Sequence, residues 1–111
     1  MFKTYLEEYN NCTVIETPFG FIGYNFQYFQ DNVKYCMITD IYIDPKHRKH
    51  GNAKSLVDQV ILIAEENECK FICSELKRDN QYKSQILVSQ IKMGFNIYNM
   101  DEYTYYLSKE L

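Results

Sequence analysis

The sequence predicts an α+β fold, in which a mixed, mostly antiparallel β-sheet is flanked by two helices in the order βββαβαββ. Three observations lead to this prediction. The first third of the chain consists of short runs rich in aromatic and β-branched residues. The middle changes to the apolar spacing of an amphipathic helix, and the chain ends in further strand-like segments around a second helical one. Because no repeat or linker interrupts the 111 residues, we expect a single domain over residues 1–111.

Three strands joined by short turns are predicted in the N-terminal third. Residues 12–17 form a β-branched run that ends at Pro18, and residues 19–29 alternate aromatic with other side chains. Residues 33–43, VKYCMITDIYI, have the clearest strand pattern and stop before Pro45, which cannot donate to a β-ladder. Because the breaks between these runs are short, we expect an antiparallel meander.

A helix and a fourth strand are predicted next. From residue 53, apolar residues recur at i, i+3, i+4, i+7, i+8 and i+11, and Asn52 is the expected N-cap. Residues 70–76 have the pattern of a strand. A right-handed crossover through the helix would place this strand parallel to residues 33–43.

The C-terminal part of the chain predicts a second helix followed by a hairpin. The helix covers residues 83–93 and ends before Gly94, which suits the left-handed position that follows many helices. The segments FNIY and EYTYYLS predict two antiparallel strands joined around NMDE.

The composition argues against several classes of protein. The net charge of −3 disfavours a nucleic-acid binder, which usually shows a wide basic face. The N-terminus has no apolar leader segment, and the longest apolar run, VILIA, is far too short to cross a membrane. The four cysteines form no CxxC pair, so we expect reduced thiols in a cytoplasmic protein.

One loop of this acidic chain is strongly basic. The stretch DPKHRKHGNAK, residues 44–54, holds both histidines and four of the twelve lysines and arginines. It joins a strand to a helix, and the small residues Gly51 and Ala53 would let a phosphate approach the exposed backbone N–H groups. The alternatives are a solvated turn, a basic patch for nucleic acid and a metal site. We expect no metal, because no carboxylate or cysteine of suitable spacing joins His47 and His50.

The stretch IYIDPKHRKHGNAKSLV resembles the acyl-CoA-binding motif of the GNAT superfamily of N-acetyltransferases. KMGFNIY is similar to the Gly-Phe turn after that family's last helix, and the resemblance covers roughly residues 12–107. It implies acetyl-CoA as co-substrate, with its pantetheine arm bonded to the backbone of Ile41 and Ile43 where two central strands splay apart. It also implies a pyrophosphate site formed by Arg48 and the N–H groups of Lys49, His50, Gly51, Asn52 and Ala53.

The chain departs from the family's pattern at the acceptor side. No room is expected for the usual pair of N-terminal helices that wall this side, so the groove is open or closed by a second subunit. Thr39 stands where the family often has Glu, and strand alternation would send the neighbouring Asp40 to the opposite face. Gln90 stands where the family often has a Tyr acid. Asp40 is the candidate base, with an exposed strand carboxylate as the alternative interpretation. Tyr82, Tyr98 or Tyr105 could replace the missing acid, and we take Tyr98 as the candidate.

We expect an N-acetyltransferase that moves an acetyl group from acetyl-CoA directly to an amine: a protein lysine, a protein N-terminus or a small amine. The alternative is a noncatalytic acyl-CoA-binding or protein-binding module that kept the cofactor loop. The aromatic-rich strands would leave apolar rings in water on a monomer, so we also expect a homodimer.

Overall fold

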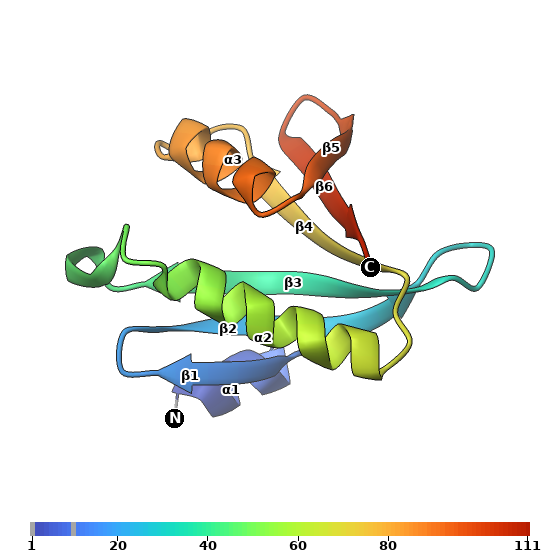
Figure 1. Ribbon diagram of the computed structural model, residues 1–111, viewed down its shortest axis with the longest axis horizontal. Helices are drawn as coiled ribbons and strands as arrows, with labels where there is room; N and C mark the ends of the chain where they lie inside the picture. Colours follow the sequence, from blue (N-terminus) through green and yellow to red (C-terminus); the bar gives the residue numbers. More distant parts are fainter. Residues whose placement is uncertain (1, 10) are drawn as a thin grey trace.

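A computed structural model describes residues 2–9 and 11–111 of the chain and shows a six-stranded sheet with three α-helices (Figure 1). The strands lie in the order β1-β2-β3-β4-β6-β5. From β1 onward the order of strands and α-helices matches the prediction. The elements are α1 (Phe2–Tyr9), β1 (Thr13–Thr17), β2 (Gly20–Tyr28), β3 (Lys34–Ile43), a 3-10 helix (Pro45–His47), α2 (Asn52–Glu66), β4 (Phe71–Lys77), α3 (Lys83–Lys92), β5 (Asn96–Met100) and β6 (Thr104–Glu110).

The helices α2 and α3 pack against one face of the sheet. The predicted apolar face of α2 is confirmed, since Leu56, Val57, Val60 and Ala64 are buried in the main hydrophobic core. The helix α3 is held to β4 by the hydroxyl of Ser74, which donates to the side-chain oxygen of Gln90 at 2.6 Å. One large core therefore lies between the sheet and these two helices.

The helix α1 was not predicted and lies on the other face of the sheet, behind β1 and β2 in Figure 1. Its Leu6 is buried with Cys12 and Val14 in a small second cluster. The eight-residue segment is too short to show a clear helical period. The predicted order βββαβαββ did not include this helix. The expectation concerned a pair of N-terminal helices, and the single helix α1 partly covers the face opposite α2 and α3.

The strands β3 and β4 are parallel, as predicted, but they pair over three residues only. Tyr35, Cys36 and Met37 pair with Phe71, Ile72 and Cys73. Beyond this point β3 stays bonded to β2 and β4 stays bonded to β6, while the two strands diverge (Figure 1). The result is a V-shaped opening in the middle of the sheet, which we call the splay.

Candidate cofactor and acceptor site

The basic loop lies at the end of one arm of the splay and leads directly into α2. The Asp44 side chain accepts a hydrogen bond from the backbone N–H of Lys46 at 2.9 Å and so caps the 3-10 helix. His47 stacks on Phe19 with ring centroids 4.3 Å apart. These contacts attach the first part of the loop to the end of the sheet.

The N-terminus of α2 has no side-chain cap. Asn52 was predicted as the N-cap, but Gly51 occupies that position and no side chain accepts from the first turn. The Asn52 side-chain nitrogen instead donates to the backbone carbonyl of His47 at 2.8 Å. The prediction is wrong because Asn52 already has helical geometry and holds the loop. The uncapped first turn favours the binding of an anion, because its backbone N–H groups are not bonded by a capping side chain and form the positive end of the helix dipole.

Two residues of the loop have left-handed backbone conformations, Lys49 with φ of 65° and Gly51 with φ of 81°. Alternation of this kind turns successive N–H groups toward one side and forms a concave anion site. This concave site and the dipole of the 15-residue helix α2 act together, and both favour the binding of a phosphate group.

A pocket of about 150 Å³ lies at this loop. It brings together six of the eight residues predicted for the cofactor, whereas Ile41 and His50 do not line it. Ser89 and Met93 of α3 also line the pocket and were missed, because nothing in the local sequence of α3 shows that it faces the loop. The lining residues are Ile43, His47, Arg48, Lys49, Gly51, Asn52, Ala53, Lys54, Ser89 and Met93.

Arg48 connects the two arms of the splay. Its Nε donates to the carbonyl of Ile43 at 2.9 Å, and its guanidinium carbon lies 5.7 Å from the Tyr42 ring and 5.9 Å from the Tyr82 ring. Tyr42 belongs to β3, whereas Tyr82 precedes α3. The guanidinium is thus held beside the pocket, where its positive charge attracts a phosphate.

A β-bulge in β3 changes the direction of the candidate base. Gly23 pairs with Asp40 and Tyr24 pairs with Ile38, so Thr39 is an extra residue in the strand. A Cβ on Gly23 would lie 2.8 Å from the Thr39 hydroxyl oxygen and 3.6 Å from an Asp40 carboxylate oxygen. Both side chains therefore point to the same face. The expectation from strict strand alternation is wrong, because the bulge resets the alternation.

This face is the one that α1 partly covers. Cys12 packs against Leu6 of α1, and its sulfur lies 3.3 Å from the position that a Cβ on Gly23 would occupy. The Thr39 hydroxyl is buried and has no hydrogen-bond partner among the described residues. Asp40 thus lies on the arm formed by β3, on the face opposite α2 and α3.

The candidate acid Tyr98 lies on the same face but on the far side of the sheet. The strands β4 and β6 separate β5 from β3, and three strand spacings amount to about 14 Å. The divergence of β3 from β4 adds to this separation between Tyr98 and the backbone of Asp40. The pKa of Tyr98 is raised above the ordinary value, mainly by partial burial and further by nearby ionisable groups that include Cys73 and Glu75. The structure does not bring Asp40 and Tyr98 together.

Glu75 is a second carboxylate that sequence reasoning missed. It is exposed on β4, where its neighbours Ser74 and Leu76 point toward the helices and the core. Glu75 therefore points to the opposite face, the same face as Asp40. The alternation of apolar and polar residues in KFICSEL predicts that Glu75 points away from the core. Only the order of strands in the sheet shows that Glu75 lies on the other arm of the splay.

Two cysteines beside the splay, Cys36 and Cys73, are fully buried. Burial raises the pKa of Cys36 to about 12 and that of Cys73 to about 11. Both thiols stay protonated at neutral pH, so neither is an acyl-carrying nucleophile.

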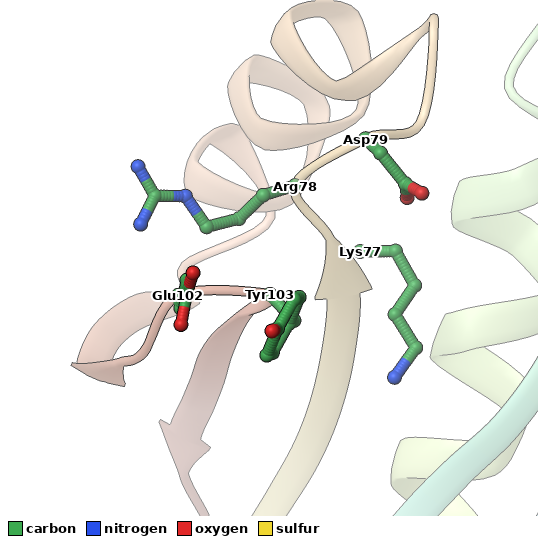
Figure 2. A pocket seen from close by; sticks show the side chains of 5 residues that line it. All are labelled: Lys77, Arg78, Asp79, Glu102 and Tyr103. Carbon is green, nitrogen blue, oxygen red and sulfur yellow. The ribbon is translucent and has the colours of Figure 1, made fainter.

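A larger hollow of about 420 Å³ lies where β4 ends, next to the turn between β5 and β6. Figure 2 shows Lys77 and Asp79 on one side of the end of β4 and Arg78 on the other, with Glu102 and Tyr103 of the turn beside them. Its two basic and two acidic side chains leave it with no net charge. This hollow lies beyond Glu75, at the end of β4.

Within residues 2–9 and 11–111, no three His, Cys, Asp or Glu side chains are grouped closely enough to hold a metal ion. Across the same part of the chain, no helix is long and apolar enough to cross a membrane.

Residues 3–88 match the acetyltransferase (GNAT) family. A search of curated proteins found no match. The fold is similar to that of nourseothricin acetyltransferase (TM-score 0.69, 22% identity), but this chain, of which 82% is covered, spans only 56% of that one.

Two further solved structures cover almost all of this chain. The NatC complex bound to a Gag peptide and CoA matches with a TM-score of 0.73 and 22% identity, over 99% of this chain and 77% of the other. Naa20 of Chaetomium thermophilum in complex with a bisubstrate analogue matches with a TM-score of 0.76 and 16% identity, over 99% and 71%. At these identities the likeness concerns the fold.

Proposed function

This chain belongs to the acetyltransferase (GNAT) family, and from that premise we propose that it moves the acetyl group of acetyl-CoA directly to an amine. One observation carries the proposal: a splay between two parallel strands ends at an uncapped helix N-terminus with left-handed Lys49 and Gly51. The structural similarity to the NatC complex, which was solved with a Gag peptide and CoA, supports both CoA as the carrier of the acetyl group and an amine as its acceptor.

The cofactor is proposed to lie with its pyrophosphate in the pocket at the loop. The N–H groups from Lys49 to Ala53 would bind the phosphate oxygens, and Arg48 would add a charge-assisted hydrogen bond. The backbone of Ile41 and Ile43 would bond the pantetheine arm, because this part of β3 has no partner strand on the side of β4. The thioester would then lie in the splay.

Asp40 is proposed as the general base. An alkylammonium group with a pKa near ~10.4 must lose a proton before its nitrogen can attack the thioester carbonyl. The carboxylate of Asp40 would take that proton from the face opposite α2 and α3. The neutral nitrogen then forms the new C–N bond as the C–S bond breaks. The nitrogen loses a second proton in this step, which balances the proton that the CoA sulfur gains on leaving as a thiol, while the first proton passes from Asp40 to solvent.

Tyr98 stays a proposal for the acid that protonates the leaving sulfur. Partial burial raises the pKa of Tyr98, so the phenol is protonated at neutral pH but is a weaker acid than an ordinary tyrosine. A CoA thiol with an ordinary pKa of about 8.5 also leaves without full protonation, so loss of this acid should lower the rate only moderately.

The noncatalytic alternative has two observations in its favour. Gln90, at the position of the family's frequent Tyr acid, is engaged by Ser74 at 2.6 Å, and Thr39 stands in place of Glu. Turnover separates the two functions. We expect calorimetry to show CoA binding and a thiol-release assay to show acetyl transfer to amines. Asp40→Asn should lower kcat and leave CoA affinity unchanged, while binding without any turnover would favour the noncatalytic module.

We further propose a homodimer formed through β5. This strand is at the edge of the sheet, carries no charge and has all five residues exposed, with Ile97 at 38% and Met100 at 54%. Pairing with a second copy would satisfy its open backbone groups and bury on the order of 1,200 Å². Light scattering tests this: Ile97→Lys should give a monomer, whereas a wild-type mass near 13.3 kDa would contradict the dimer.

All four cysteines are free thiols. We take this as support for the cytoplasm as the proposed compartment, where thiols stay reduced.

A further inference from the structure

The half of the sheet formed by β4, β6 and β5 has an uncovered face opposite α2 and α3. In Figure 1, α1 lies behind β1 and β2 only, and no described helix lies behind β4, β5 and β6. Glu75 shares this face with three tyrosines from three different strands, and one of them, Tyr106, is its direct cross-strand partner. The three tyrosines are Tyr35 on β3, Tyr98 on β5 and Tyr106 on β6.

The register of the sheet brings these side chains to one face. Glu75 and Tyr106 are direct partners in the antiparallel pair of β4 and β6. Directly opposed residues of two strands point to the same side, with Cβ atoms about 5 Å apart. The rings of Tyr106 and Tyr98 have centroids 6.3 Å apart and lie at 54° to each other. The Tyr106 ring therefore lies beside Glu75 on the neighbouring strand, and the Tyr98 ring lies next to that of Tyr106.

The rings are held in place before any ligand arrives. The Tyr106 hydroxyl donates to an Asp101 carboxylate oxygen at 2.7 Å, and the Tyr35 hydroxyl donates to the side-chain oxygen of Gln27 at 2.7 Å. Tyr35 also stacks on Phe29 with centroids 4.2 Å apart. Because both hydroxyl groups are occupied, these rings offer their faces and edges to a ligand.

Glu75 is the one acidic residue of β4. Burial is the main cause of the raised pKa of Tyr35 and of Tyr98, and the hydrogen bond to Asp101 is the main cause for Tyr106; Glu75 adds a smaller contribution to each, so its charge acts on all three. The pKa of Asp101 is lowered mainly by the hydrogen bond from Tyr106 and also by Lys77, which lies two residues beyond Glu75 on the same face, with its Nζ 3.5 Å from the Thr104 hydroxyl. A carboxylate bordered by aromatic faces is suited to an alkylammonium cation.

We propose that Glu75, with the rings of Tyr35, Tyr98 and Tyr106, binds a second ammonium group of the acceptor, so that this protein prefers diamines and polyamines over monoamines. The inference rests on the proposed acetyl transfer. Glu75 is two residues beyond Cys73, the last residue of β4 that pairs with β3, and so lies about 7 Å along one arm of the splay. A short alkyl chain spans this distance, placing one amine at the thioester and the other at Glu75.

Steady-state kinetics with matched acceptors test the specificity. 1,5-Diaminopentane should have a kcat/KM at least about tenfold above that of pentylamine, after correction for its two reactive ends. In Glu75→Gln this ratio should fall to near unity through a higher KM for the diamine. Glu16→Gln, the same change on an exposed residue of β1, should keep the wild-type ratio. Equal values for the two amines in the wild type would overturn the proposal.

Two further variants separate binding from chemistry. Tyr98→Phe keeps the ring and should keep the diamine preference, whereas Tyr98→Leu should reduce it. If Glu75→Gln instead lowers kcat equally for both amines and shifts the pH profile, Glu75 acts on the chemistry and the ammonium site is refuted.

A binding measurement keeps the test independent of turnover. 1,5-Diaminopentane titrated into the CoA-saturated protein should shift the tyrosine ring signals in NMR spectra at millimolar concentration, and Glu75→Gln should abolish the shift. Binding without acetyl transfer would support the ammonium site and contradict only the proposed reaction. Absence of binding in the wild type would refute the site.

Discussion

Replacing Gly51 with Ala should weaken both the fold and the binding of CoA, by separable amounts. Gly51 has φ of 81°, a conformation that costs an L-residue about 1–2 kcal/mol. Alanine also restricts the unfolded chain, which offsets about 0.5 kcal/mol of that cost. The free energy of unfolding should therefore fall by about 1 kcal/mol, which lowers Tm by about 4 °C in a domain of this size.

The loss of CoA affinity should be larger than this loss of stability. A Cβ on Gly51 would meet no protein atom within 4 Å, so it would project into the space proposed for the phosphate. Losing one charge-assisted hydrogen bond of about 1.5–3 kcal/mol weakens affinity by about 10- to 100-fold. At CoA concentrations near 100 Kd, the wild type gains about 2.7 kcal/mol from binding, and the variant should keep about 1.4 kcal/mol of this after a 10-fold loss of affinity or about 0.4 kcal/mol after a 100-fold loss.

Gly94→Ala is the matched control for this experiment. Gly94 also has a left-handed backbone, with φ of 96°, but its Cβ would meet the flexible side chain of Lys109 at 3.2 Å and not the loop. Differential scanning calorimetry with and without CoA should show similar Tm losses for the two variants and a reduced CoA shift only for Gly51→Ala. An undiminished CoA shift in Gly51→Ala would refute the assignment of the phosphate site.

Three further predictions concern the rest of the molecule. Gly23→Ala should lower kcat while CoA still binds, since its Cβ would lie 2.8 Å from the Thr39 hydroxyl oxygen and displace the bulge; unchanged kinetics would count against the acceptor face. Hydrogen bonds from Tyr106 and the backbone lower the pKa of Asp101, so its stabilising effect is present above the ordinary carboxyl pKa and is lost as pH falls below about 4. Urea titrations should therefore show a weaker acid dependence in Asp101→Asn than in the wild type. The raised pKa values of Cys36 and Cys73, about 12 and about 11, stabilise the fold at neutral pH, an effect lost above about pH 8.5 as the unfolded thiols ionise. An aromatic disulfide reagent should modify them only at the rate of unfolding, and fast modification of the native protein would contradict their burial.

The order of the main helices and strands and the basic loop were predictable from the sequence, because both follow from patterns among residues that are close together in the chain. The apolar spacing of α2 records which of its sides is buried, and Gly94 adopts the left-handed conformation predicted for it. The cofactor loop combines charge and small residues within eleven positions. Each of these signals depends on neighbours a few residues away along the chain, so a single sequence contains them.

The acceptor side was decided by the tertiary structure. The bulge at Thr39 depends on how β3 pairs with β2, and it turns Asp40 to a face that strict alternation would not predict. The splay depends on where β3 and β4 stop pairing, and the tyrosines on the face of Glu75 come from β3 and from the distant C-terminal strands β5 and β6. The pairing register and the divergence of the strands depend on packing between distant parts of the chain, and the local periodicity of the sequence does not predict them.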